Sequence, residues 1–99
     1  MSLLAIGRAQ SGMQVAGARL NATANNTANL NTEGYREYEV QAVENESGVK
    51  AKVRRAPQPG ADAIGNAMEM KSAYLMFVAN LRVVERSDEM LGQTMDILA

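Results

Sequence analysis

Hydrophobic positions in the last third of the chain recur at alternating steps of four and three residues. This period places them along one side of an α-helix, as in the seam of a coiled coil. Pro57, Pro59 and Gly60 interrupt any helix before this segment, and Asp62 is a suitable N-cap. We therefore predict a C-terminal helix over residues 63–99. Its predicted seam includes Met70, Tyr74, Phe77, Leu81, Val84, Asp88, Leu91, Met95 and Leu98.

The first third of the chain has the same stepping, with smaller side chains. It predicts an N-terminal helix with an asparagine-rich exit over residues 1–33. The larger members of its seam are Ile6, Met13, Leu20 and Leu30. The many Ala and Gly residues around them let a second helix approach closely, but the glycines weaken this helix in isolation. We therefore expect this segment to need a partner helix.

The segment between the two helices has the two-residue period of β-strands. Residues 35–43 and 49–53 alternate around a turn at 45–48, which predicts a β-hairpin within residues 34–56, followed by a Pro/Gly linker at 57–62. A lone two-stranded hairpin is marginal in water, so it should lean on the helices or on a neighbouring subunit. The predicted fold is mainly α, in one domain of residues 1–99. It is a long antiparallel α-helical hairpin, coiled-coil-like, with a small β-hairpin in the connecting segment.

The second helix carries more apolar side chains than one partner helix can cover. Seven lie off its seam, namely Ile64, Met68, Leu75, Met76, Val78, Val83 and Met90. Full burial of a large apolar side chain is worth roughly 1.5–3 kcal/mol, so even half burial of this set rivals the whole stability of a small domain. Either the β-hairpin folds back over them, or helices of different copies associate. We prefer association between copies.

Composition excludes most catalytic chemistry. The 99 residues include no Cys and no His, which leaves no disulfide and no ordinary zinc or iron ligand set. The sequence also lacks a calcium-binding loop, a glycine-rich phosphate loop and a nucleophile elbow. We therefore expect no enzyme activity, no metal and no cofactor.

Charge and hydropathy limit the possible partners. The formal net charge is −1, so no strong field attracts nucleic acid or a membrane surface. Lys50, Lys52, Arg54 and Arg55 could touch phosphates, but no aromatic residue stands among them for base stacking, and a solvated edge strand is the preferred interpretation. The longest apolar run, residues 73–79, is too short to cross a bilayer. The N-terminus lacks the features of a cleavable signal peptide.

The most specific motif is rich in asparagine and occupies residues 24–35. Asn21, Asn25 and Asn29 lie four residues apart on one helical face. Asn31 and Gly34 suit a chain that leaves its helix through positive φ or a side-chain turn, and a polar helix end is the simplest interpretation of the composition. The order of residues, however, matches a longer pattern. It is formed by Asn25, Asn26, Ala28, Asn29, Asn31, Thr32, Gly34 and Tyr35.

This pattern resembles the N-terminal signature of bacterial flagellar basal-body rod, hook and hook-associated proteins. Residues 77–91 are similar to the closing helix of the same family. The residues that carry this second resemblance are Phe77, Ala79, Asn80, Asp88, Met90 and Leu91. Members of the family typically insert a larger β-rich domain between their terminal helices, whereas this chain has only about thirty residues there.

The resemblance implies a structural subunit of the flagellum basal body. The terminal segments would pair as helices in the inner tube of an axial filament, with copies of the chain and other flagellar axial proteins as partners. Such subunits are exported unfolded by the flagellar type III apparatus without cleavage, which would place this protein in the periplasmic rod or hook. The alternative is a soluble helical adaptor or regulator derived from this family. It would be cytoplasmic and would bind one flagellar partner through the same exposed stripe.

Overall fold

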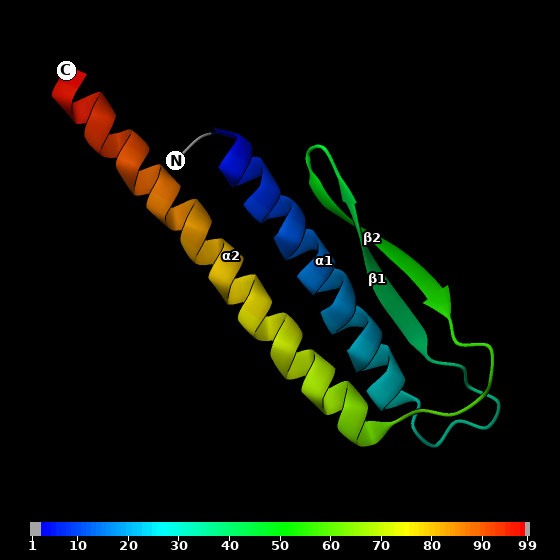
Figure 1. Ribbon diagram of the computed structural model, residues 1–99. Helices are drawn as coiled ribbons and strands as arrows, with labels where there is room; N and C mark the ends of the chain where they lie inside the picture. Colours follow the sequence, from blue (N-terminus) through cyan, green and yellow to red (C-terminus); the bar gives the residue numbers. More distant parts are fainter. Residues whose placement is uncertain (1–2, 99) are drawn as a thin grey trace.

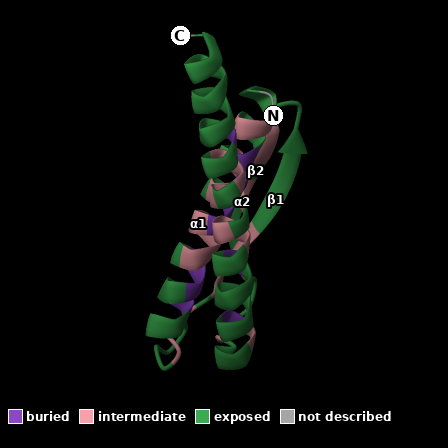
Figure 2. Ribbon diagram, turned by 90° about the vertical axis from the view of Figure 1, so that its left-hand side faces the viewer, coloured by how far each residue is buried: buried purple, intermediate pink, exposed green. Residues whose placement is uncertain are grey.

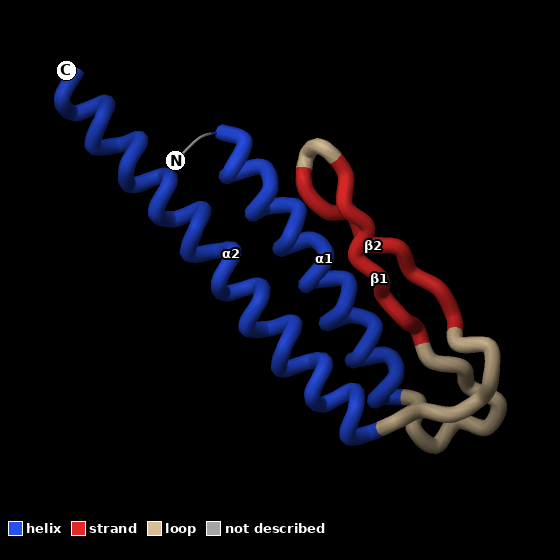
Figure 3. Tube along the Cα trace, in the orientation of Figure 1, coloured by secondary structure: helices blue, strands red, loops and turns tan. Residues whose placement is uncertain are grey.

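The computed structural model describes residues 3–98, so Met1, Ser2 and Ala99, which the sequence places in the terminal helical segments, lie outside the described residues. Two long helices run side by side in opposite directions, and a two-stranded hairpin lies along one of them (Figures 1 and 3). The mainly α fold with a small antiparallel β-hairpin is therefore confirmed. In chain order the elements are α1 (Leu3–Ala28), β1 (Tyr38–Asn45), β2 (Gly48–Arg55) and α2 (Ala63–Leu98).

The two strands form a regular antiparallel ladder. It runs from the pair Tyr38 and Arg55 to the pair Asn45 and Gly48. Only Glu46 and Ser47 remain in the turn, which is two residues shorter than predicted. The Oδ1 atom of Asn45 accepts a hydrogen bond from the backbone N–H of Ser47 at 2.9 Å. Gly48 has φ of 139°, a value that only glycine adopts readily, so these residues allow the strands to extend into the turn.

The β-hairpin packs against α1 alone. Both strands contact α1, and within the described part of the chain neither strand contacts α2. The backbone N–H of Val49 donates to Ser11 Oγ at 3.1 Å, and that hydroxyl donates to the carbonyl of Arg8 at 2.7 Å. A Cβ at Gly48 would collide with the same Ser11 hydroxyl. The hairpin therefore does not fold over α2. Of the two explanations for the surplus apolar residues of α2, burial under the hairpin is wrong.

The contact between the helices is made of small and polar side chains. Asn26 on α1 is hydrogen-bonded to Asn66 on α2, and Gly12 lies beside Asn80. From Asn26 to Gly12 on α1 and from Asn66 to Asn80 on α2 are both 14 residues, so the two antiparallel helices are aligned residue for residue between these contacts. A Cβ at Gly12 would lie 2.8 Å from the Asn80 Nδ2 atom, so glycine permits this close approach. The buried residues of the two helices are Ala9, Gly12, Val15, Ala16, Ala22, Thr23, Asn26, Asn66, Ala73 and Ser87.

The buried stripe of α2 lies one residue before the predicted seam. Ala73 is 1% exposed, whereas its neighbour Tyr74, which the pattern placed in the seam, is 59% exposed. Asn66 and Ser87 are likewise buried, and Asp88 is exposed. The physical reason is size: helices that touch through Gly and Ala leave no room for Tyr or Met between them. The large apolar residues consequently flank the contact.

The C-terminal part of α2 projects past the beginning of α1 (Figure 1). Continuing the alignment of the two helices places Leu3 near residue 89, so later residues of α2 have no described α1 residue opposite them. Ser87 is the last buried residue, and every residue from 88 to 98 is exposed (Figure 2). We call residues 88–98 the overhang. Of the predicted seam, Asp88, Leu91, Met95 and Leu98 lie in it, and the last three have no described α1 residue opposite them.

Candidate functional site

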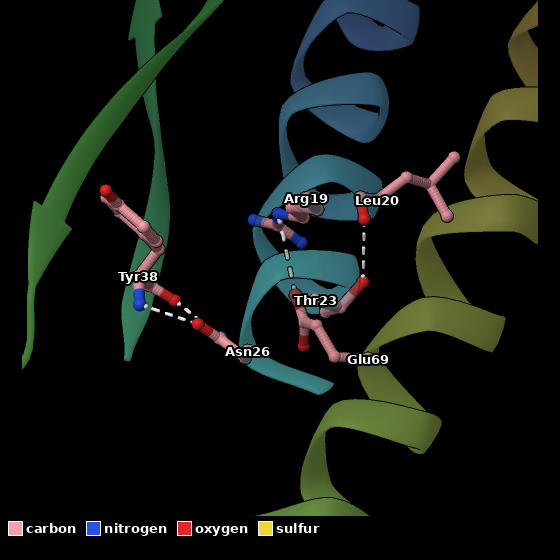
Figure 4. Close-up of polar contacts among 6 residues, drawn as sticks. All are labelled: Arg19, Leu20, Thr23, Asn26, Tyr38 and Glu69. Atoms are coloured by element: carbon pink, nitrogen blue, oxygen red, sulfur yellow. Dashed lines mark hydrogen bonds and ion pairs between the residues drawn. The ribbon is translucent and has the colours of Figure 1, made fainter. Parts of the chain in front are cut away.

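Asn26 is the centre of a polar junction that ties α1 to β1 and α2. Its side-chain amide pairs with the backbone of Tyr38 in both directions. Nδ2 donates to the Tyr38 carbonyl at 3.0 Å, and Oδ1 accepts from the Tyr38 N–H at 2.9 Å (Figure 4). Nδ2 also donates to Asn66 Oδ1 at 2.9 Å, and Oδ1 accepts from the Tyr35 hydroxyl at 2.8 Å. All four hydrogen-bonding positions of the amide are therefore used.

Asn66 extends the junction to the beginning of α2. Its Nδ2 atom donates to Glu37 Oε1 at 2.6 Å and to the Asp62 carbonyl at 2.7 Å. The same Glu37 oxygen accepts the backbone N–H of Asp62 at 2.7 Å. Asp62 directly precedes α2, as the sequence predicts for its N-cap. The junction therefore fixes where α2 begins relative to β1 and α1.

Tyr35 and Tyr38 close the outer side of the junction with Arg55. The Arg55 guanidinium lies 4.3 Å from the centroid of the Tyr38 ring and 5.4 Å from that of Tyr35. It also donates from Nε and Nη2 to the carbonyl of Arg36, at 3.1 and 2.9 Å. Burial raises the pKa of Tyr35 above its ordinary value, partly offset by the charge of Arg55. The Tyr35 hydroxyl is consequently held in its neutral form, which can donate to Asn26.

A cavity of about 250 Å³ lies beside the junction, between α1, β1 and α2. Arg19 borders it, with its Nε atom 3.8 Å from Glu69 Oε1 and without a hydrogen-bond partner (Figure 4). The Thr23 hydroxyl, also on its wall, donates to the Leu20 carbonyl at 3.0 Å. No His or Cys exists in the chain, and the described residues contain no acidic cluster that could hold a metal ion.

The other residues of the asparagine-rich motif shape the exit from α1. Asn25 and Asn29 each donate from Nδ2 to the helix carbonyl four residues earlier. Asn29 Oδ1 accepts from the Thr32 hydroxyl at 3.0 Å. Gly34 has φ of 75°, so it supplies the positive φ predicted for the exit, whereas Asn31 does not. Ala28, Asn31 and Thr32 are exposed, and only Asn26 joins separate elements through a buried side chain.

The predicted seam residues form an apolar surface around the helix contact. Met13 and Phe77 border one shallow groove together with Gln10 and Gln14. Ile6, Met13 and Leu20 recur every seven residues on α1, so they lie along one face of that helix. Met70, Phe77 and Val84 likewise lie along one face of α2. Ile6, Met13, Leu20, Leu30, Phe77, Leu81 and Val84 are half-buried, and Met70 and Tyr74 are exposed.

The outer side of α2, away from α1, carries a short exposed apolar stripe formed by Ile64, Met68 and Leu75. Ile64 is 75% exposed, Met68 and Leu75 are also exposed, and Met76, Val78 and Val83 are half-buried. Among the residues of the closing-helix resemblance, Asn80 faces Gly12 and Ala79 is exposed. Asp88, Met90 and Leu91 lie in the overhang. Between residues 3 and 98, neither helix contains a stretch apolar enough to cross a membrane.

The basic row on β2 is partly neutralised within the hairpin. Arg54 Nε donates to Glu39 Oε2 at 2.8 Å, and Arg55 is stacked on Tyr38. Lys50 and Lys52 remain exposed. Of the four cations that could touch phosphates, Lys50 and Lys52 are therefore the two outside these side-chain pairs.

Comparison with known proteins gives one family match. The family described as flagella basal body rod protein matches residues 8–36, which include most of α1, the asparagine-rich motif and its exit. The match confirms the resemblance to this family. No curated protein matches the chain.

Proposed function

We propose that this chain is a structural subunit of the flagellar basal body that assembles by packing its helices against those of other copies. The match of residues 8–36 to the rod family supports a flagellar structural component. The proposed site is the periplasmic rod or hook. Export by the type III apparatus and contacts with other axial proteins belong to the same proposal. Enzyme activity has no place in it.

One observation carries the self-assembly part of this proposal. The hairpin covers α1, while the outer stripe of α2 and the overhang have no cover in the described chain. Exposed apolar side chains that form a large contiguous patch often mark an interaction surface. Repeated association through such a patch offers several kcal/mol of burial, which a thin core built on Ala and Gly does not provide.

Light scattering after size-exclusion chromatography, over a wide range of concentration, tests the proposal. The triple variant Ile64→Gln, Met68→Gln, Leu75→Gln should remain folded, because all three side chains are exposed. It should lose the concentration-dependent growth in mass that we expect of the unchanged chain. Val43→Gln with Val53→Gln is the matched control, since both are exposed apolar residues on the hairpin. Growth that is equal in all three proteins would refute the role of the stripe.

The adaptor is the second candidate function, because the same exposed stripe could bind one different partner. It predicts a monomer at every concentration that forms a stoichiometric complex with one purified flagellar protein. The two candidates are therefore separated by the mass of the chain alone. Growth without a partner supports the structural subunit, and a stable monomer supports the adaptor.

A further inference from the structure

Charge is distributed unequally along α2. In the stretch from residue 63 to 84, Glu69 is directed to Arg19, and the other two charged residues are Lys71 and Arg82, both exposed. From residue 88 to 98 all three charged residues are acidic, namely Asp88, Glu89 and Asp96. The two parts of one helix are thus complementary in charge.

Each part also carries an apolar stripe with the same stepping, exposed except for the half-buried Val78. On the outer side of α2, positions 64, 68, 71, 75, 78 and 82 alternate steps of four and three, which places them on one helix face. In the overhang, positions 88, 91, 95 and 98 follow the same rule. The first stripe is apolar and basic, and the second is apolar and acidic.

The overhang is poorly suited to exist alone. The overhang continues α2, but most helical stability in proteins comes from tertiary packing, and the part after residue 89 has no described α1 residue opposite it. Their apolar side chains are among the most exposed of the chain, with Leu98 at 79% and Met95 at 62%. A surface of opposite charge and matching period on another molecule would stabilise this segment.

We propose that the overhang of one copy packs on the outer stripe of α2 in the next copy, so that the subunits associate head to tail. This inference rests on the proposed function and specifies its contact. The steps of the two stripes coincide when parallel helices are shifted by about 20 residues, or roughly 30 Å. That shift brings Met95 onto Leu75 and Leu98 onto Val78. It also brings Asp88 onto Met68 and Leu91 onto Lys71, so that Asp88 lies within one turn of Lys71.

The contact joins two different surfaces of the same chain, so it is heterologous. Such a contact leaves one overhang and one outer stripe free at opposite ends of every oligomer that has not closed into a ring. Growth then continues as a ring or an open helical array instead of stopping at a dimer. Two overhangs packed on each other would instead give a closed, symmetric dimer, and like charges would face each other in it.

Engineered cysteines test the contact, because the chain has no cysteine of its own. The double variant Leu75→Cys, Met95→Cys should form a ladder of covalent oligomers on mild oxidation, since both side chains are exposed. Val53→Cys with Met95→Cys pairs the overhang with an exposed hairpin residue, and it should give no ladder. Covalent dimers from Met95→Cys alone, with no ladder from the double variant, would overturn the proposal.

Charge reversal supplies an independent test. Lys71→Glu should raise the concentration of half-assembly by up to about fivefold, the range expected for one exposed ion pair. Asp88→Lys in the same chain should restore it, and Lys50→Glu on the hairpin should have no effect. If copies assemble but neither the ladder nor the restoration is seen, the head-to-tail contact is wrong while the proposed function stands. If the unchanged chain never assembles, the proposed function itself fails.

Discussion

The two ends of this rod are built on opposite physical principles. At the closed end, where the loops join the helices, polar side chains satisfy one another, and Asn26 uses all four of its hydrogen-bonding positions. At the open end, the overhang exposes Leu91, Met95 and Leu98 with no partner in the described chain. Directional hydrogen bonds are therefore concentrated at the closed end, whereas the open end consists of exposed helix.

This difference teaches how a small chain can fold and still keep adhesive surface. A core large enough to bury every apolar residue of α2 would leave nothing for a partner. Here the junction fixes the angle and start of α2 through directional hydrogen bonds, which need little buried area. Many apolar residues of α2 then remain exposed.

The largest effect is expected from Asn26→Ala. The substitution removes the partners of the Tyr38 backbone, the Tyr35 hydroxyl and the Asn66 amide. Leaving buried polar groups unpaired costs about 1–3 kcal/mol for each group, so a loss of about 3 kcal/mol or more is expected. Thermal or urea unfolding followed by circular dichroism measures it. Asn25→Ala is the control, since Asn25 is exposed, and a loss of similar size in both variants would contradict the role of the junction.

A smaller loss is expected when the close contact between the helices is filled. Gly12→Leu inserts a large side chain at a position where even a Cβ would lie only 2.8 Å from the Asn80 Nδ2 atom. Overpacking of this kind costs about 1–3 kcal/mol. Gly17→Ala is the matched control. A Cβ there meets nothing within 4 Å, so this variant should gain about 0.5–1 kcal/mol from helix propensity. Urea unfolding of both proteins should therefore give changes of opposite sign, and equal signs would refute the contact.

The sequence predicted the elements better than their faces. The steps of four and three, the prolines before residue 63 and the alternation around residues 45–48 were sufficient for two helices and a hairpin. The buried stripe of α2 lies one residue before the predicted seam because small side chains, and not the large hydrophobic ones, make the contact. The contact follows small residues such as Gly12 on α1 and Ala73 on α2, and a pattern of large apolar residues does not select that face.

The candidate site shows the same limit. Asn26 was identified as part of a motif, but nothing in the sequence distinguishes it from the exposed Asn25 beside it. Its role depends on Tyr38 and Asn66, which are 12 and 40 residues away. The overhang also could not be predicted, because it follows from the alignment of the helices. That alignment is fixed by side-chain contacts far apart in the chain.

A smaller change in stability is expected when one hydrogen bond of the junction is removed, and its pH dependence can be measured. The raised pKa of Tyr35 means that the folded protein holds the phenol proton more tightly than the unfolded chain does. The contribution is complete below the ordinary tyrosine pKa of 10.0 and is lost as pH rises through the folded value. Tyr35→Phe should cost about 1 kcal/mol at neutral pH and should weaken this alkaline loss. Urea unfolding between pH 7 and 11 measures both, and an unchanged alkaline profile would refute the assignment.

The smallest effect on monomer stability is expected at the open end. Leu91→Gln with Leu98→Gln changes two exposed residues of the overhang, so the free energy of unfolding of the dilute monomer should move by less than about 0.5 kcal/mol. Amide exchange should show why: residues 88–98 should exchange fast in dilute monomer, while the part of α2 between Asn66 and Ser87 should be protected by α1. At high concentration the overhang of the unchanged chain should gain protection, and that of the variant should not. Slow exchange throughout α2 in dilute monomer would mean that the overhang is stable without a partner, and the contrast between the two ends would then be lost.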